Sequence, residues 1–141
     1  MIEVACAILI DKNRLLFTQR KANSEHPLMW EFPGGKVHNG ESAENCIHRE
    51  IAEELEIEID ILERLKPVAF DYGFKKIMLI PFLCSAKYFQ IKLNEHVQYK
   101  WIEINDIEHV DLLEADKKLI SQTENQKSLK KYLRKQVDKP G

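Results

Sequence analysis

An acidic cluster in the first half of the chain has the residue types and the spacing of a metal site. Glu50, Glu53 and Glu54 are three and four residues apart, so a helix through them places the three carboxylates on one face. Like charges at this spacing repel each other by roughly a few tenths of a kcal/mol per pair. A hard divalent cation is bound by oxygen ligands and removes this repulsion. We therefore expect Mg²⁺, with Mn²⁺ as the alternative ion, on this helix face.

The residues just before the cluster are suited to a phosphate. Gly34 and Gly35 allow the backbone to approach a ligand closely and to turn sharply, and Lys36 adds a positive charge. Magnesium bound by carboxylates commonly bridges to substrate phosphates. The alternative is a glutamate-rich helix that only makes a solvated surface. The glycine pair, the lysine and the carboxylates together favour a site for a phosphate-bearing substrate.

The segment 35–57 resembles the signature of the Nudix hydrolases. That signature reads Gly, five residues, Glu, seven residues, Arg-Glu, an aliphatic residue, any residue, Glu-Glu, any residue, Gly and an aliphatic residue. Every place but one is filled here, by Gly35, Glu41, Arg49, Glu50, Ile51, Glu53, Glu54 and Ile57. Such a long, gapped match is highly specific, whereas E-x-x-E-E alone would be weak. The resemblance extends to about residue 122 and is closest to the MutT branch and its CTP pyrophosphohydrolase relatives.

The resemblance implies which residues bind metal and which take part in the chemistry. Divalent metal would be bound by Glu50, Glu53, Glu54, Glu95 and the carbonyl oxygen of Gly34. Glu95 is included because it stands six residues before Trp101, as in the MutT pattern. Either Glu53 or Glu95 would accept the proton of the attacking water, and the sequence does not choose between them.

Four further residues acquire roles from the same resemblance. Arg49 matches the family arginine that orients a signature glutamate, and Glu41 matches the glutamate that supports the loop before the helix. Arg20 and Lys36 are similar to residues that contact the phosphate chain. These assignments predict a catalytic set of Glu50, Glu53, Arg49 and Glu95.

Selection of the nucleobase is predicted to involve Asp116. In MutT-like enzymes this position reads the base, with Asn for oxidised guanine and Asp in cytosine-type relatives. An ionised Asp only accepts hydrogen bonds and suits an exocyclic amino group such as that of cytosine, whereas a protonated Asp could donate. A helix cap is the alternative interpretation of Asp116. Phe74 is a candidate to stack on the base, as are Trp30 and Phe32, although core packing is the commoner role for such aromatic residues.

The one departure from the signature is Glu56, which stands where the family has glycine. Glycine serves there as a left-handed helix cap. Glu56 therefore either adopts that backbone, at a cost of about 1 kcal/mol, or lets the helix end in another way. This places the end of the helix in question, but not the chemistry.

The surrounding sequence predicts a mixed sheet with a few helices. The stretch Glu3–Ile10, rich in Val, Ile and Ala, and the extended pattern of Leu15–Gln19 suggest a hairpin, and the polar segment 21–28 suggests an exposed loop. Further strands are predicted over 57–70, 74–88 and 99–104, and a helix from about residue 113 to 120. The resemblance makes this α/β (α+β) pattern a Nudix-type alpha/beta/alpha sandwich over residues 1–126.

The C-terminal segment 127–141 is predicted to be a short basic helix or tail. Leu129, Tyr132 and Leu133 fall at helical spacing, with the lysines on the solvated side. This segment is either part of the same domain or flexible. A nucleic-acid role for it is less favoured than a solvated face.

Composition excludes several classes of protein. The 141 residues suit one domain, and 21 basic against 23 acidic residues give no global field for nucleic acid or an anionic membrane. No apolar run reaches the roughly 18 residues of a membrane span, and the first residues lack a secretory pattern, so we expect a cytoplasmic protein. Cys6, Cys46 and Cys84 are far apart and are predicted to be buried, inert thiols.

The sequence thus predicts a Mg²⁺-dependent nucleoside triphosphate pyrophosphohydrolase that releases a nucleoside monophosphate and pyrophosphate. A (d)CTP-type or oxidised purine nucleotide, such as 8-oxo-dGTP, is the preferred substrate. An ADP-ribose or other nucleoside diphosphate-X diphosphatase is the rival within enzymes, and a Nudix-fold module that binds a nucleotide without cleaving it is the rival outside them. A monomer or homodimer is expected, with no nucleic-acid or membrane partner.

Overall fold

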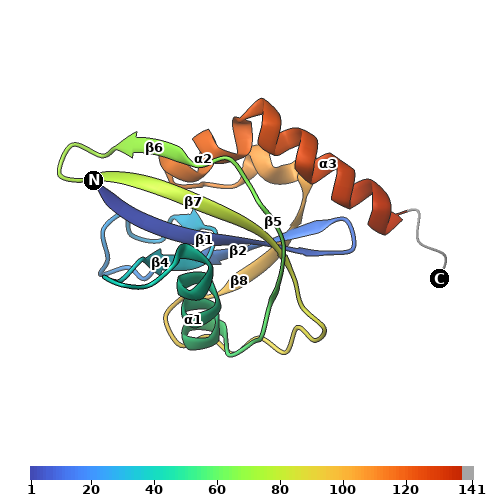
Figure 1. The fold of residues 1–141 in the computed structure, drawn as a ribbon, viewed down its shortest axis with the longest axis horizontal. Helices are drawn as coiled ribbons and strands as arrows, with labels where there is room; N and C mark the ends of the chain where they lie inside the picture. Colours follow the sequence, from blue (N-terminus) through green and yellow to red (C-terminus); the bar gives the residue numbers. More distant parts are fainter. Residues whose placement is uncertain (138–141) are drawn as a thin grey trace.

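The computed structural model describes the backbone of residues 1–137 and the side chains of residues 1–133. Its centre is a mixed sheet in which β1 (Ile2–Asp11) runs parallel to β7 (Lys76–Ser85). Beyond β7 lie β5 (Asp60–Arg64) and β6 (Val68–Asp71), which both pair antiparallel with it. This mixed sheet was predicted from the sequence (Figure 1).

The other side of β1 carries the strands that lead to the glycine pair. β1 and β2 (Arg14–Gln19) form the predicted hairpin, and β2 also pairs with β3 (Trp30–Glu31) and β8 (Tyr99–Glu103). β4 (Gly34–Lys36) is antiparallel to β1. The glycine pair and Lys36 are therefore held against the central strand β1.

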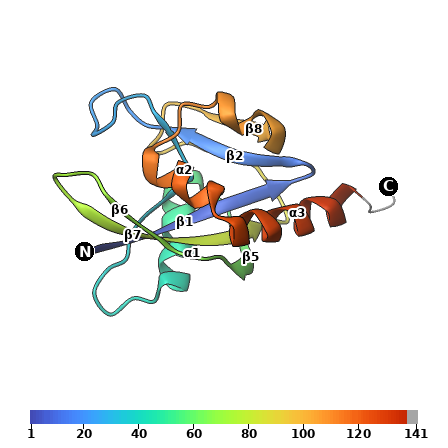
Figure 2. The ribbon, with the colours of Figure 1, turned by 90° about the horizontal axis from the view of Figure 1, so that it is seen from above.

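Helices cover both faces of the sheet. α1 (Ala43–Leu55) lies on one face, and α2 (Glu114–Ser121) and α3 (Thr123–Val137) lie on the other, with the 3-10 helix η1 (Ile104–His109) after β8 (Figures 1 and 2). Side chains alternate across a strand, so β1 contributes to two separate cores. Cys6, Ile8 and Ile10 pack under α2 and α3, whereas Ala5, Ala7 and Leu9 pack under α1. The predicted alpha/beta/alpha sandwich is confirmed.

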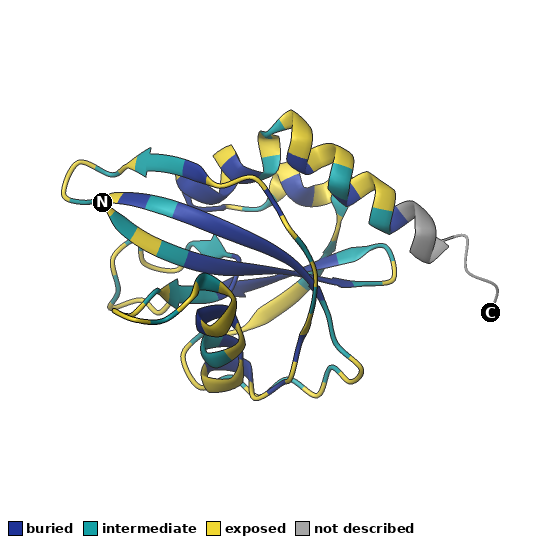
Figure 3. Ribbon diagram, in the orientation of Figure 1, coloured by how far each residue is buried: buried dark blue, intermediate teal, exposed yellow. Residues whose placement is uncertain are grey.

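Burial follows these layers. Figure 3 shows the central strands buried and the outer sides of α1 and α3 exposed. Leu129 and Leu133 of α3 are buried, and Lys127, Lys130 and Lys131 are exposed, as the predicted amphipathic pattern requires. α3 runs across residue 126, where the sequence placed the end of the domain; the position of this boundary stays a prediction. Residues 138–141 of the predicted tail lie outside the described residues.

Two predicted elements differ in the structure. The strand expected over 57–70 is two strands, β5 and β6, because Pro67 has no N–H to give to the ladder. Lys66, between the two strands, has its backbone groups bonded by the side chain of Asn125 of α3 in place of a neighbouring strand. The Asn125 side chain accepts from Lys66 N at 2.8 Å and donates to Lys66 O at 3.1 Å. The strand expected to reach residue 88 ends at Ser85. Within the residues described, no helix is both long and apolar enough to span a bilayer.

The signature helix α1 has a defined beginning and end. Ser42 is its N-cap, and its hydroxyl accepts from Asn45 N at 3.0 Å. Glu56 ends the helix in the left-handed conformation, with φ 55° and ψ 42°, and its N–H donates to Ala52 O at 3.1 Å. The sequence left two ways for the helix to end at Glu56, and the chain adopts the strained one, in which Glu56 is left-handed. Asn94 Nδ2 then donates to Glu56 Oε2 at 3.0 Å and holds the side chain.

Candidate metal and nucleotide site

The glycine pair is required by close packing. A Cβ atom on Gly34 would overlap the carbonyl oxygen of Ala5 on β1, and one on Gly35 would overlap the carboxylate of Glu50. Neither glycine has a positive φ, so the reason is space and not a sharp turn. Because Gly35 has no side chain, the Glu50 carboxylate lies directly against the backbone of β4.

Arg49 gathers three carboxylates of the signature. Its Nε and Nη2 donate to the two oxygens of Glu41 at 2.7 and 2.9 Å, which is the forked geometry that favours arginine over lysine. Its Nη1 donates to Glu50 at 3.0 Å and to Glu53 at 3.3 Å. The hydrogen bonds from Arg49 and from His38 N lower the pKa of Glu41 to about 2. The structure thus brings together Arg49, Glu41 and Glu50 around the loop before α1.

Glu54 is the buried carboxylate of the cluster. Its exposed fraction is 8%, and Oε2 accepts from Gly34 N at 3.1 Å. Burial raises the pKa of Glu54 to about 9, with further contributions from the charges of Glu50, Glu31 and Glu95. A carboxylate surrounded by other carboxylates is the environment in which a divalent cation restores the charged form. The donor set therefore fits a hard divalent ion bound by oxygen.

The loop between β7 and β8 brings Glu95 to the same place. Lys92 N and Asn94 N donate to the carbonyl oxygens of Leu55 and Glu54, each at 3.0 Å, and Asn94 Nδ2 donates to Glu53 O at 2.8 Å. These bonds satisfy carbonyl groups at the end of α1 that otherwise lack partners. The end of the signature helix and the Glu95 loop are consequently fixed to one another.

The predicted metal ligands are neighbours, but they do not yet form a complete set. Glu54, Glu95 and Gly34 line one cavity, whereas Glu50 and Glu53 are turned toward Arg49 and the Glu53 side chain is 60% exposed. Among the residues that the structure describes, no three acidic, histidine or cysteine side chains are arranged as ready metal ligands. Metal binding by Glu50 or Glu53, as predicted from the sequence, would require each to give up part of its contact with Arg49.

The cavity beside these carboxylates has a volume of about 280 Å³ and mixes both signs of charge. Arg20 and Lys36, predicted to contact phosphates, line it, and so do Lys21 and Lys75, which the sequence analysis did not single out. The side chains of Glu31, Glu54, Glu95 and His96 complete its polar wall. Cations and metal-binding carboxylates facing one cavity suit a polyphosphate with its metal ion.

Glu31 and His96 were missed as functional candidates. Glu31 accepts from Arg20 Nη1 at 2.9 Å and lies 2.9 Å from His96 Nε2, and its side chain is only 16% exposed. The sequence did carry one signal, because Glu31 is an acidic residue between Trp30 and Phe32 in an otherwise apolar segment. Its partners are distant in sequence, so the signal could not say what it binds.

A second cavity of about 100 Å³ adjoins the first, with Asp116 in its wall. Asp116 lies in the first turn of α2, whose N-cap is Leu113, and its Oδ2 accepts from Phe32 N at 2.8 Å. The helix-cap interpretation of Asp116 is therefore wrong. Burial, and then the charge of Glu31, raise the pKa of Asp116 to about 8. The raised pKa favours the protonated carboxyl, which can donate as well as accept.

The aromatic residues predicted to stack on the base lie either in the wall of the second cavity or outside it. Phe32 lines the second cavity, as does Tyr72, which the sequence analysis overlooked. Tyr72 OH accepts from Ala115 N at 3.0 Å, which fixes its ring beside α2. Phe74 is 61% exposed in the β6–β7 turn, with its ring centroid 6.2 Å from that of Tyr72, and is not among the lining residues of either cavity. Any stacking by Phe74 would require this turn to move.

The three thiols are buried and free, as expected. Burial raises the pKa of Cys6, Cys46 and Cys84, so they are poor nucleophiles.

Comparisons with known proteins agree with this arrangement. The model of the NUDIX domain matches residues 1–123. An 8-oxo-dGTP diphosphatase from Buchnera aphidicola subsp. Schizaphis graminum (strain Sg) is 31% identical over 106 residues, which cover 75% of this chain and 80% of that protein. The CTP pyrophosphohydrolase of Escherichia coli (strain K12) is 31% identical over 116 residues, or 82% of this chain and 86% of that protein.

Solved structures are also similar. The solution structure of the E. coli ORF135 protein has a TM-score of 0.73 at 28% identity and covers 100% of this chain and 94% of its own. The crystal structure of the MutT protein from Methanosarcina mazei Go1 has a TM-score of 0.75 at 26% identity, with 98% and 96% covered.

Proposed function

This chain belongs to the NUDIX family and is a Nudix hydrolase, and we propose that it cleaves nucleoside triphosphates between the α and β phosphorus atoms, releasing a nucleoside monophosphate and pyrophosphate. The observation that supports this substrate is the pair of adjoining cavities. One offers cations and carboxylates for a polyphosphate with its metal, and the other offers Asp116 and aromatic walls for a base. Relatives named 8-oxo-dGTP diphosphatase and CTP pyrophosphohydrolase support the same reaction class.

Nudix hydrolases generally use a divalent metal, and we propose Mg²⁺ here. The ligands would be Glu50, Glu53, Glu54, Glu95 and the carbonyl oxygen of Gly34. When bound, the ion supplies positive charge for the phosphate oxygens and makes water more acidic. The chain's own residues do the rest: Arg49 orients Glu50, and Arg20 and Lys36 bind the phosphate chain.

Either Glu53 or Glu95 would accept the proton of the attacking water. Glu53 is exposed on α1 and Glu95 lines the cavity from the β7–β8 loop, so both can reach solvent. Glu53→Gln should lower turnover by at least about two orders of magnitude if Glu53 ligates metal or takes the proton. Glu44→Gln is a suitable control, because Glu44 lies on the same helix but pairs with Arg64 at 3.0 Å, away from the cavity. Near-normal turnover of Glu53→Gln would remove Glu53 from the site.

Base selection is proposed to depend on the protonated state of Asp116. With one oxygen accepting from Phe32 N, the carboxyl can offer its O–H to a base atom, as an amide would. A protonated acid can therefore serve an oxidised purine, whereas its ionised form accepts from the amino group of cytosine. The proposed substrate is accordingly a (d)CTP-type nucleotide or an oxidised purine nucleotide such as 8-oxo-dGTP, and the raised pKa of Asp116 favours the second.

The test is a substrate panel with Mg²⁺, scored for pyrophosphate against orthophosphate. CTP, dCTP, dGTP, 8-oxo-dGTP and ADP-ribose are suitable members. Pyrophosphate from a cytidine or oxidised purine nucleotide, abolished by EDTA, is the expected result. Orthophosphate alone would move the cleavage site, faster turnover of ADP-ribose would favour the diphosphatase rival, and tight binding without product would favour a nucleotide-binding module.

A further inference from the structure

Tyr72 joins the turn between β6 and β7 to the beginning of α2. Its hydroxyl accepts a hydrogen bond from Ala115 N at 3.0 Å. Ala115 is the second residue of α2, and the N–H groups in the first turn of a helix have no partner within the helix. The N-cap of α2 is Leu113, whose side chain makes no capping hydrogen bond. The Tyr72 hydroxyl therefore performs the task of a helix cap from another element of the fold.

The turn that carries Tyr72 gives its side chain a defined position. Gly73 N donates to Asp71 Oδ1 at 2.7 Å, which closes the turn next to Tyr72. The centroid of the Tyr72 ring lies 4.6 Å from that of Phe70 and 4.8 Å from that of His26. Because the ring packs against aromatic neighbours from β6 and from the loop before β3, the hydroxyl reaches α2 from a fixed support.

The beginning of α2 is bound to two walls of the second cavity. At one wall, Asp116 Oδ2 accepts from Phe32 N at 2.8 Å. At the other wall, Ala115 N donates to the Tyr72 hydroxyl. Phe32, Tyr72 and Asp116 all line this cavity. Because Ala115 and Asp116 are consecutive, the bond to Tyr72 restrains the backbone that carries the Asp116 carboxyl.

We propose that Tyr72 is a positioning residue for base selection, whose hydroxyl holds the first turn of α2 so that the Asp116 carboxyl meets the base in one orientation. The inference rests on the proposed function, in which the second cavity receives the base and Asp116 reads it. It requires no contact between the Tyr72 hydroxyl and the base. Without the hydroxyl, Ala115 N loses its partner and the first turn of α2 gains freedom, so Asp116 should distinguish bases less well.

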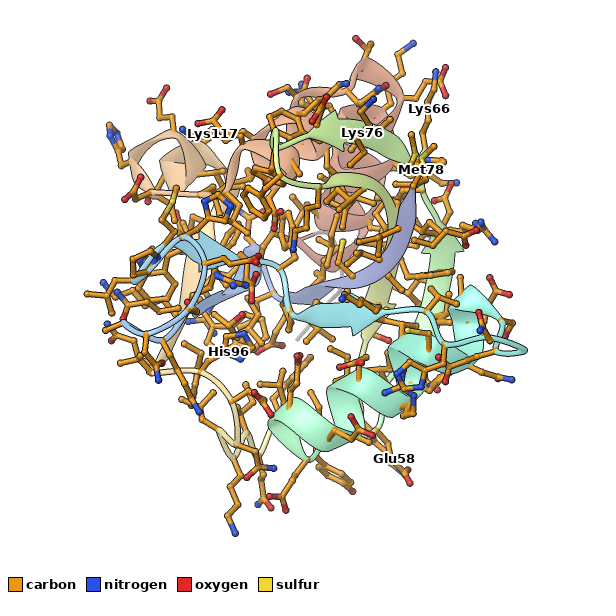
Figure 4. The ribbon with its side chains drawn as sticks, turned by 90° about the vertical axis from the view of Figure 1, so that its left-hand side faces the viewer. Glu58, Lys66, Lys76, Met78, His96 and Lys117 are labelled. Carbon is orange, nitrogen blue, oxygen red and sulfur yellow. The ribbon has the colours of Figure 1, made fainter. Side chains whose placement is uncertain are left out.

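A second contact between the same two elements provides a matched control. Lys118 Nζ of α2 donates to Ala69 O of β6 at 2.7 Å. Figure 4, with Lys76 and Lys117 labelled, shows this side of the molecule, where β6 lies beside α2. Lys118 is not among the lining residues of either cavity. Lys118→Met therefore weakens the contact between α2 and β6 without removing a group from the wall of the base cavity.

The first measurement is hydrogen exchange of the Ala115 amide, which needs no substrate. Tyr72→Phe removes the hydroxyl and keeps the ring, so this amide should exchange at least about threefold faster than in wild type. In Lys118→Met, which keeps the Tyr72 hydroxyl, the exchange rate should stay near that of wild type. Equal rates in wild type and Tyr72→Phe would show that the hydroxyl does not hold α2, and the inference would be overturned.

The second measurement compares kcat/KM for pairs of nucleotides that differ only in the base, namely 8-oxo-dGTP with dGTP and CTP with UTP. In the pair that wild type distinguishes, Tyr72→Phe should lower the preference about three- to tenfold, which is the range of one net hydrogen bond. Lys118→Met should keep the wild-type preference. A triphosphate without a base, 2′-deoxyribose 5′-triphosphate, should be cleaved with the same kcat/KM by wild type and both variants.

An Asp116→Ala background tests whether Tyr72 acts through Asp116. The preference is already reduced there, so adding Tyr72→Phe should change it by less than about twofold. A further loss as large as that caused by Tyr72→Phe alone would mean that the hydroxyl contacts the base itself, and would overturn the positioning role. Thermal unfolding checks that each variant is folded, and the comparison with Lys118→Met decides the inference even if Asp116→Ala does not fold.

The remaining outcomes separate this inference from the proposed function. If Tyr72→Phe keeps the wild-type preference, or Lys118→Met loses as much, the inference is overturned and the proposed cleavage stands. The same holds if Tyr72→Phe loses an equal factor on the triphosphate without a base, because the hydroxyl then supports the fold in general. If wild type distinguishes neither pair, no base selection exists for Tyr72 to support. If wild type cleaves no nucleotide, the proposed function fails and takes this inference with it.

Discussion

Replacing Asp116 with asparagine should make the protein more stable at high pH, by an amount that depends on pH. Burial, the main cause, raises the pKa of Asp116 from 3.8 to about 8 in the folded chain. The unfolded chain ionises this group near pH 4 and the folded chain keeps it protonated, so wild type loses stability as pH rises from about 4 to about 8. An asparagine does not titrate, and its oxygen can still accept from Phe32 N.

The size of the effect follows from the pKa difference. Each pH unit in that window lowers the free energy of unfolding of wild type by about 1.4 kcal/mol. The gap, meaning the difference in free energy of unfolding between Asp116→Asn and wild type, should therefore widen by up to about 4 kcal/mol from about pH 5 to about pH 8. Relaxation of the folded protein around the charge reduces this figure. At about pH 4 both side chains are neutral, and the two proteins should differ little.

Urea unfolding followed by tryptophan fluorescence, at several pH values, measures this gap. Asp111→Asn is the matched control, because it makes the same chemical change at an exposed carboxylate three residues before α2. A gap for Asp116→Asn that is the same at about pH 5 and about pH 8 would refute the reasoning. Asp116 would then be ionised in the folded protein, and its role as a hydrogen-bond donor to the base would fail with it.

Three further predictions concern α1. Mg²⁺ should raise the Tm of the wild type and not that of Glu54→Gln, because an ion that binds only the folded chain stabilises it. If Mg²⁺ raised the Tm of both proteins equally, Glu54 would be excluded as a ligand. Arg49→Lys should lower kcat/KM at least about tenfold, since an ammonium group cannot make the forked contacts of Arg49, and an unchanged value would contradict its orienting role. Glu56→Gly should leave the free energy of unfolding unchanged or raise it by up to about 1 kcal/mol, because glycine adopts positive φ without strain. A lower urea midpoint, or lost metal-dependent turnover, would show that the Glu56 side chain contributes more than its contact with Asn94.

Local information in the sequence was sufficient for the signature helix and most of the strands. The spacing of Glu50, Glu53 and Glu54 placed them on one helix, and the residues rich in Val, Ile and Ala along β1 predicted a strand. The interruption between β5 and β6 could have been predicted from the sequence, because Pro67 lies between them. Its partner Asn125 could not, because the two segments meet only when α3 packs on the sheet.

The sequence by itself determined the family and the helix that carries the carboxylates, because these depend on short-range spacing. Only the tertiary structure decided that Glu31 joins Arg20 to His96, that Asp116 is buried against Phe32, and that the Glu95 loop is fixed to the end of α1. Hydrogen bonds between residues so far apart in the chain depend on how the layers pack. Burial, which sets the protonation of Glu54 and Asp116, likewise exists only once the chain is folded.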